Sequence, residues 1–154
     1  MTRYTHPTRL SIQQGITFLE LMIVVAIIAM ISAFAFPSYM QYVVNTKRTA
    51  ATSTLLQIAD RQQQFFMDNK TYANDLTDLG FLEHPLFVQD DGTQIAAGDA
   101  GAVYVLTLVN IAPTTYTAIA APLGGQLKRD TDCGTLTLNQ AGTKDAFGGG
   151  DDCW

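Results

Sequence analysis

One carboxylate lies inside a long apolar run near the start of the chain. The run extends from Ile16 to Phe36 within the string GITFLELMIVVAIIAMISAFAFP, and Glu20 is its single charged residue. About 20 apolar residues are enough to cross a bilayer. An acidic residue deep in a membrane helix costs roughly 2.5 to 3.5 kcal/mol on insertion scales, and less near one end. Glu20 therefore needs a partner that compensates its charge.

The residues before this run predict a targeting element. Met1 to Gln14 include Arg3 and Arg9 and no acidic residue, which is the charge bias that holds an N-terminus in the cytoplasm. An ordinary secretory signal is an alternative, with a small-residue cleavage site at Ala33-Phe34-Ala35. We rank this alternative second. The apolar run is longer than the usual signal-peptide core of about 7 to 15 residues, and such a core does not require an acidic residue such as Glu20.

The segment Gly15 to Ile28, GITFLELMIVVAII, closely resembles the class III signal of type IV pilins, and Pro37-Ser38-Tyr39 continues the resemblance. In that family a membrane-embedded aspartyl peptidase cuts after the glycine and methylates the new N-terminus. The resemblance implies cleavage between Gly15 and Ile16 and methylation of Ile16. Phenylalanine is the commonest residue at the latter position, so Ile16 is a departure from the pattern, although the family tolerates bulky apolar residues there.

Cleavage at this place would give Glu20 a partner. It creates a free amine on Ile16, and a carboxylate four residues on is about one helical turn away, so each charge can neutralise the other. In pilins the pair is thought to form between subunits, which implies that Glu20 sets the register of helices in a filament core. The alternative is a pair within one helix that has no part in assembly.

Cys133 and Cys153 are the only cysteines of the chain. A segment that follows an exported membrane helix enters an oxidising compartment, so we predict a disulfide, with a pair of free thiols as the alternative. Closing a loop of about 20 residues would stabilise the fold by roughly 3 kcal/mol. The resemblance agrees, since pilins commonly close a C-terminal loop in this way, and Cys153-Trp154 is similar to the ending of PilE-type minor pilins.

Other candidate sites are weak. Asp90-Asp91 and Asp151-Asp152 could offer oxygen ligands to calcium. However, calcium needs about six to eight ligands, and no calcium-binding loop pattern surrounds either pair. We therefore predict solvated surface there, with no metal and no cofactor. His84 is the sole histidine after processing, and no nucleophile or carboxylate pair supports it as a base. The sequence predicts neither catalytic residues nor a small-molecule substrate.

The charge balance argues against nucleic acid as a partner. The formal charge is −5, and loss of the leader removes two basic residues and takes it to −7. Tyr72, Tyr104 and Tyr116 could stack on bases, but their acidic surroundings favour core or interface packing.

Downstream of Pro37 the apolar spacing predicts that one helix continues to about Met67. Pro37 should bend it, or, as an alternative, end it before a second helix begins. Asp68 to Tyr72 should terminate it, and Asn74 to Phe81 reads as a short helical turn with Gly80 at its end. Two helix faces are candidates for burial: Tyr39, Val43, Thr46, Ala50, Thr54 and Ile58; and Ala51, Leu55, Ile58, Gln62, Phe65 and Phe66.

Three later stretches predict strands through their β-branched and aromatic content: Val103 to Val109, Thr115 to Ala121, and Thr135 to Asn139. The links between them, Asn110 to Thr114 and Pro122 to Gly134, suit an antiparallel meander packed on the helix. Residues 83–102 give weak signals, apart from a tight turn at Asp91-Gly92.

We therefore predict an α+β protein of the type IV pilin fold, with a long N-terminal α-helix packed on a small antiparallel β-sheet head. The expected parts are a leader (1–15), a transmembrane and filament-core helix (16–36), and a head (37–154) that contains an amphipathic helix (37–67) and the sheet (103–154). The head, of about 118 residues, suits one modest core.

The resemblance implies a structural subunit of a type IV pilus, held in the bacterial inner membrane before assembly and displayed on the cell surface afterwards. Its partners would be other pilin subunits, prepilin peptidase and the inner-membrane assembly machinery. A minor pilin needed for assembly, adhesion or motility is favoured over a major pilin or a type II secretion pseudopilin. A surface-displayed binding module for DNA or a host surface is the alternative of another class.

Overall fold

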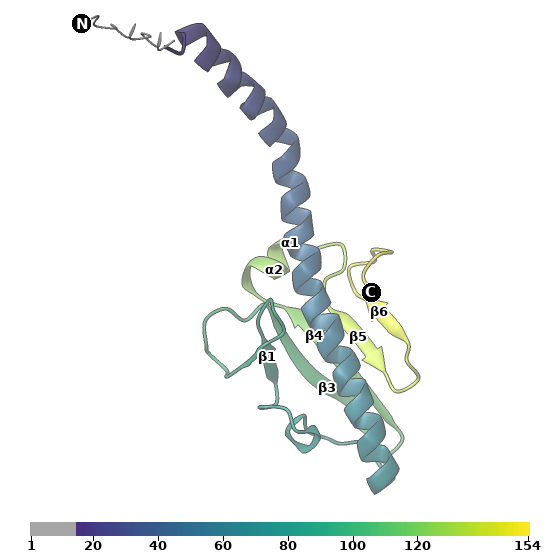
Figure 1. Cartoon of the computed structure of the whole chain (residues 1–154). Helices are drawn as coiled ribbons and strands as arrows, with labels where there is room; N and C mark the ends of the chain where they lie inside the picture. The colour runs from purple at the N-terminus through teal and green to yellow at the C-terminus, as the bar shows by residue number, and fades with distance from the viewer. Residues whose placement is uncertain (1–14) are drawn as a thin grey trace, which may run out of the picture. The chain divides into compact units, whose positions relative to one another are not determined.

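A computed structural model describes residues 15–154; the predicted leader lies outside the described residues except for Gly15. The chain divides into two compact units, one ending at Tyr39 and the other running from Met40 to Trp154. Helix α1, Phe18–Asn69, begins in the first unit and ends in the second (Figure 1).

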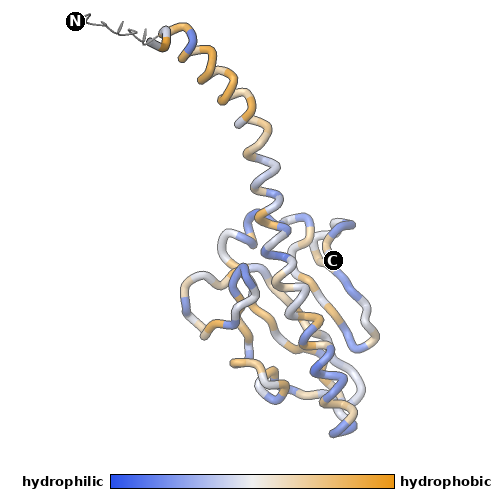
Figure 2. Tube along the Cα trace, viewed as in Figure 1, coloured by the Kyte–Doolittle hydropathy of each residue, from blue (hydrophilic) through white to orange (hydrophobic). Residues whose placement is uncertain are grey.

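Pro37 lies inside α1. The alternative in which this proline ends the membrane helix is therefore wrong, whereas the bend expected at Pro37 stays a prediction. Proline is tolerated at this point although it cannot donate the backbone hydrogen bond of a helix interior. The hydropathy changes along α1, from an apolar start in the first unit to a mixed pattern in the second (Figure 2).

In the second unit, one stripe of α1 is buried. Leu55, Ile58 and Gln62 are fully buried, as the second predicted face requires. The first predicted face is wrong at its start, because Tyr39 and Thr46 are exposed. Spacings of three and four residues continue the stripe upstream through Ala51, Arg48 and Val44 instead.

The end of α1 and the turn after it agree with the sequence. The helix ends at Asn69, and Lys70 adopts a positive φ of 57°. A short 3₁₀ helix, η1 (Thr77–Leu79), follows and ends at Gly80 with φ 78°. Asp75 accepts a hydrogen bond from the backbone N–H of Thr77 at 2.8 Å. The predicted helical turn that ends at Gly80 is confirmed.

One six-stranded antiparallel sheet has the order β2-β1-β3-β4-β5-β6. Its central hairpin joins β3 and β4, where Ala112 pairs with Thr115 across Pro113-Thr114. The strands are β1 (Leu86–Val88), β2 (Gln94–Ile95), β3 (Tyr104–Ala112), β4 (Thr115–Pro122), β5 (Leu136–Asn139) and β6 (Lys144–Ala146).

The three predicted strands are β3, β4 and β5, but the sheet is not confined to residues 103–154. The segment with weak signals holds β1 and β2, whose hairpin turn is closed by Gly92 N–H donating to the Gln89 carbonyl at 3.1 Å. A short helix, α2 (Gly124–Arg129), occupies part of the predicted link after Pro122. Strands of two or three residues are too short to show a period of two, so pairing with β3 defines them rather than their own pattern.

The core lies between α1 and one face of the sheet. Alternate residues of β3, β4 and β5 are buried, as expected for a sheet with one covered face. The members of this core that come from α1 and these strands are Ala51, Leu55, Ile58, Tyr104, Leu106, Leu108, Tyr116, Ala118, Ala120, Leu136 and Leu138. The predicted α+β fold is confirmed.

Candidate functional site

The start of α1 places the predicted processing site just outside the helix. Gly15, Ile16 and Thr17 are not helical and are exposed. The Thr17 hydroxyl accepts a hydrogen bond from the Glu20 N–H at 3.2 Å, and the Thr17 carbonyl accepts from Leu21 N–H at 3.2 Å. Thr17 is thus the N-cap, and Glu20 lies in the first turn, where a carboxylate faces the positive end of the helix dipole.

The residues that follow form an uncovered apolar surface. From Phe18 to Phe36, the large apolar side chains are 49% to 80% exposed. The helix is long and apolar enough at this end to cross a membrane. Apolar surface of this extent must be covered by lipid or by other protein.

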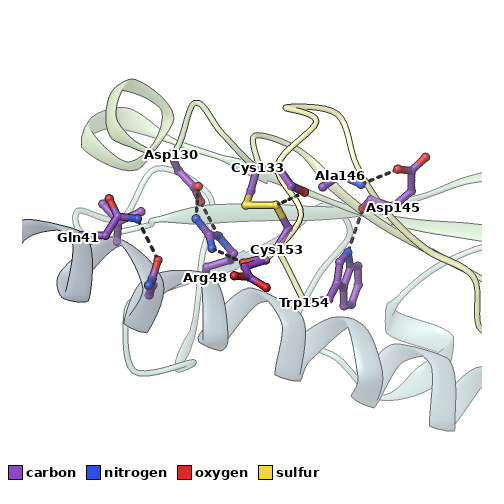
Figure 3. The surroundings of a disulfide bond; sticks show 12 residues. Gln41, Arg48, Asp130, Cys133, Asp145, Ala146, Cys153 and Trp154 are labelled. Carbon is purple, nitrogen blue, oxygen red and sulfur yellow. Dashed lines mark hydrogen bonds and ion pairs between the residues drawn. A yellow bond between two sulfur atoms is a disulfide. The ribbon is translucent and has the colours of Figure 1, made fainter.

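The structure contains the predicted disulfide between Cys133 and Cys153, with their Cα atoms 5.4 Å apart. The closed loop carries β5 and β6, and Figure 3 shows the disulfide that closes it. Two of its glycines, Gly148 and Gly150, have a packing reason. Gly150 N–H donates to the Asp132 carbonyl at 2.7 Å, and a Cβ at Gly148 would collide with the same carbonyl.

The residue after the second cysteine is also held in place. The Trp154 ring nitrogen donates to the Asp145 carbonyl at 3.0 Å, and the Lys144 ammonium lies 5.2 Å from the ring centroid of Trp154. Both contacts attach the tail to β6.

A buried polar cluster, the Asp130 cluster, is not among the sites predicted from the sequence. It is made of Arg48, Tyr104, Gln126 and Asp130. Arg48 forms an ion pair with Asp130 through two guanidinium nitrogens. Tyr104 donates to the same carboxylate at 2.7 Å, and Gln126 does so at 3.0 Å. Gln126 also donates to the Val44 carbonyl of α1 at 3.1 Å.

These contacts change the ionisation of the cluster. Burial alone would raise the pKa of Asp130, but hydrogen bonds from Arg48 and Tyr104 outweigh it and hold that pKa below its usual range. The hydrogen bond with Asp130 raises the pKa of Arg48 against the opposing effect of burial. Burial, followed by the bond to Asp130, raises the pKa of Tyr104. The cluster therefore holds a charged pair inside the fold.

Arg48 also donates to the backbone carbonyl of Asp152 at 3.1 Å, which links α1 to the disulfide loop (Figure 3). A signal for this residue exists in the sequence, since Arg48 has the spacing of the buried stripe. Its partner Asp130 is 82 positions away and shares no local pattern with it.

The weaker candidates have structural roles or stay solvated. Asp91 accepts a hydrogen bond from Thr93 N–H at 2.8 Å and so closes the β1–β2 turn. Asp151 and Asp152 are exposed, and residues 15–154 contain no group of three or more side chains suited to a metal ion. His84 accepts from Leu76 N–H at 3.3 Å.

The three tyrosines considered as stacking residues belong to the core, as predicted. Tyr72, Tyr104 and Tyr116 are all buried. The rings of Tyr72 and Tyr116 meet edge to face, with their centroids 4.8 Å apart.

Two family models match the chain. Residues 37–137 match the family described as "Type IV minor pilin ComP, DNA uptake sequence receptor". Residues 10–36 match the "Prokaryotic N-terminal methylation motif". The two matches adjoin at Pro37 and together cover residues 10–137.

Curated relatives of this chain are fimbrial proteins and type IV pilins. A fimbrial protein of Pseudomonas aeruginosa is 33% identical over 93 residues, which cover 56% of this chain and 60% of the relative. The type IV major pilin protein PilA of Myxococcus xanthus is 34% identical over 68 residues, covering 44% and 31%.

A type IV major fimbrial protein FimA of Dichelobacter nodosus is 44% identical over 57 residues, covering 34% of this chain and 36% of the relative. The matched segments thus span 60% or less of these relatives' lengths. With a family model covering most of the head and the methylation motif covering the apolar start, the chain belongs to the type IV pilins, in the family described as type IV minor pilin ComP.

Proposed function

We propose that this chain is a structural subunit of a type IV pilus, processed by prepilin peptidase and assembled into an extracellular filament as a minor pilin. The observation that carries the proposal is the exposed apolar start of α1, which holds one carboxylate, Glu20, just after a glycine. Lipid covers this surface before assembly, and the helices of other subunits cover it in the filament.

The local geometry supports processing between Gly15 and Ile16. The bond lies ahead of the N-cap Thr17 in an exposed, non-helical stretch, where a peptidase can reach it. The new amine of Ile16 then lies at the positive end of the helix dipole, an unfavourable place for a cation. A carboxylate of Glu20, from the same or a neighbouring subunit, offsets this charge.

The parts of the chain have separate roles in this proposal. The leader (1–15) is removed, the segment 16–36 anchors the subunit in the inner membrane and later packs in the filament, and the head (37–154) lies outside the cytoplasm. Pro37 gives the helix a local bend near their junction. The disulfide suits an oxidising, exported location.

A minor rather than a major pilin is proposed because the family model that matches the head is described as a minor pilin. The curated relatives include major pilins, so the major role remains the alternative. The pseudopilin alternative is less favoured because of the disulfide-closed tail.

Two measurements on native material test the proposal. N-terminal sequencing and intact mass should give a chain that begins at Ile16, with the added mass of one methyl group. Quantitative proteomics of sheared appendages, from wild type and a deletion strain, should find the subunit at a low ratio to a bulk pilin and fewer filaments without it. A chain beginning at Phe36 would contradict the proposal, because the apolar segment would be lost.

DNA binding by the displayed head is a second candidate, favoured by the description of the matching family as a DNA uptake sequence receptor. The net charge of −7 after processing opposes it, but Lys128 and Arg129 are exposed together on α2. Binding of duplex DNA by the detergent-solubilised mature chain should weaken with salt and in Lys128→Glu/Arg129→Glu, relative to a Lys70→Glu control. Absence of salt-sensitive binding would exclude this candidate.

A further inference from the structure

One guanidinium group contacts both segments that carry the cysteines. Arg48 donates two hydrogen bonds to Asp130, three residues before Cys133. Its remaining terminal nitrogen donates to the carbonyl of Asp152, the residue before Cys153. Figure 3 shows the Arg48 side chain extending from α1 to Asp130, beside the disulfide.

The contact on the Cys133 side is firmly held. Asp130 is 1% exposed, and its carboxylate also accepts hydrogen bonds from Tyr104 and Gln126. Its backbone carbonyl accepts from Gly134 N–H at 2.8 Å, across the turn that contains Cys133. When α1 is docked, Arg48 therefore fixes the position of this turn.

The contact on the Cys153 side holds the end of a segment that has no helix or strand and that is tied to the Cys133 side as far as Gly150, whose N–H donates to the Asp132 carbonyl at 2.7 Å. Phe147 to Asp152 contain three glycines and no regular element. Within the described part of the chain, the hydrogen bond from Arg48 to Asp152 is the one that joins α1 to this segment. Asp151 and Asp152 lie between the Gly150 hydrogen bond and Cys153, and the bond from Arg48 at Asp152 reduces the conformations that the Cys153 thiol can sample.

We propose that Arg48 is a positioning residue for disulfide formation, so that docking of α1 brings Cys133 and Cys153 together before they are oxidised. The oxidant is an oxidised dithiol protein or oxidised glutathione. One cysteine thiolate attacks the disulfide of the oxidant, which gives a mixed disulfide and releases one thiol of the oxidant. The second cysteine thiolate then attacks the mixed disulfide, forms the Cys133–Cys153 bond and releases the oxidant's other thiol. The two cysteines lose two protons to solvent and two electrons to the oxidant.

The test measures the effective concentration of the two thiols. The full chain in detergent is reduced and then equilibrated with glutathione buffers of known ratio, and alkylation with mass spectrometry gives the oxidised fraction. Arg48→Met removes every donor while keeping an apolar side chain of similar length. In native buffer its effective concentration should be about tenfold lower than wild type, since a charged hydrogen bond is lost beside each cysteine segment. In concentrated urea the two should agree.

Matched variants separate positioning from general loss of stability. Lys47→Met changes the neighbouring cation of α1, which makes none of these bonds, and should keep the wild-type value. Ile58→Val weakens the core of α1 and should lower the melting temperature with little change in effective concentration.

Should Arg48→Met fail to fold, Arg48→Lys decides the question. It keeps the charge beside Asp130, but one ammonium cannot fork to both segments. We expect a several-fold lower effective concentration of the two thiols in native buffer, and no difference from wild type in concentrated urea. A wild-type effective concentration in Arg48→Lys, or an equal loss in Ile58→Val, would overturn the proposal. Neither result bears on processing at Gly15, so this test is independent of the proposal that the chain is a pilus subunit.

Discussion

Gln62 forms a two-point clamp on the backbone of Ala73. Its side-chain amide donates to the Ala73 carbonyl at 3.0 Å, and its side-chain carbonyl accepts from Ala73 N–H at 2.9 Å. Gln62 is fully buried, so both backbone groups depend on it rather than on water. The clamp holds the returning chain against α1 just after the helix ends at Asn69.

Gln62→Leu should lower the free energy of unfolding by about 2 to 4 kcal/mol, because it leaves two buried backbone groups of Ala73 without partners. Thermal unfolding followed by circular dichroism measures the loss. Gln64→Leu is the matched control, since Gln64 is exposed and its side chain donates to Asp60 one turn earlier. Equal effects of the two substitutions would show that the clamp contributes nothing.

Gly80→Ala should destabilise the head by about 1 to 2 kcal/mol, because Gly80 has φ 78°, a conformation unfavourable for other residues. The new Cβ would also lie 3.3 Å from the Arg61 guanidinium, which donates to the Leu79 carbonyl. Gly125→Ala serves as control, since a Cβ there meets nothing within 4 Å. A larger drop in melting temperature in Gly125→Ala than in Gly80→Ala would contradict the prediction.

The Asp130 cluster should make stability fall steeply in acid. The pKa of Asp130 is lower in the folded chain than its ordinary value, which is about 3.9. Its contribution is therefore complete above that ordinary value and is lost as the pH falls through the lower, native pKa. Melting temperatures measured from neutral pH down to about pH 2 should drop across this window.

Asp130→Asn should remove much of this acid dependence and lower stability at neutral pH by about 3 to 5 kcal/mol, because it leaves the buried charge of Arg48 unpaired. Asp99→Asn, at an exposed carboxylate, should leave the whole profile close to wild type. An unchanged acid limb in Asp130→Asn would assign the acid dependence to other groups.

Glu20→Ala should block incorporation into filaments while cleavage after Gly15 continues. The substitution leaves the amine of Ile16 without a partner in an apolar setting, which costs more than the pair itself contributes. Immunoblots of membranes and sheared filaments report processing and incorporation separately, with Asp99→Ala as a control carboxylate in the head. Wild-type amounts of Glu20→Ala in filaments would favour the alternative, a pair within one helix without a role in assembly.

Local signals in the sequence were sufficient for much of this protein. The apolar run after Gly15, the lone Glu20 and the two cysteines predict a pilin start and a closed C-terminal loop without any knowledge of packing. The long helix follows from its apolar periodicity, and strands β3, β4 and β5 follow from their β-branched and aromatic content.

Tertiary structure decided the rest. Strands β1 and β2 exist through pairing with β3, and the burial of Arg48 depends on Asp130, 82 residues away. A charged residue on an apolar helix face can be exposed or can be buried in an ion pair. Which of the two occurs depends on a partner that is distant in the sequence. Periodicity reports what neighbouring residues share along one element. Pairing between elements is a property of the folded chain, where contacts and desolvation act together.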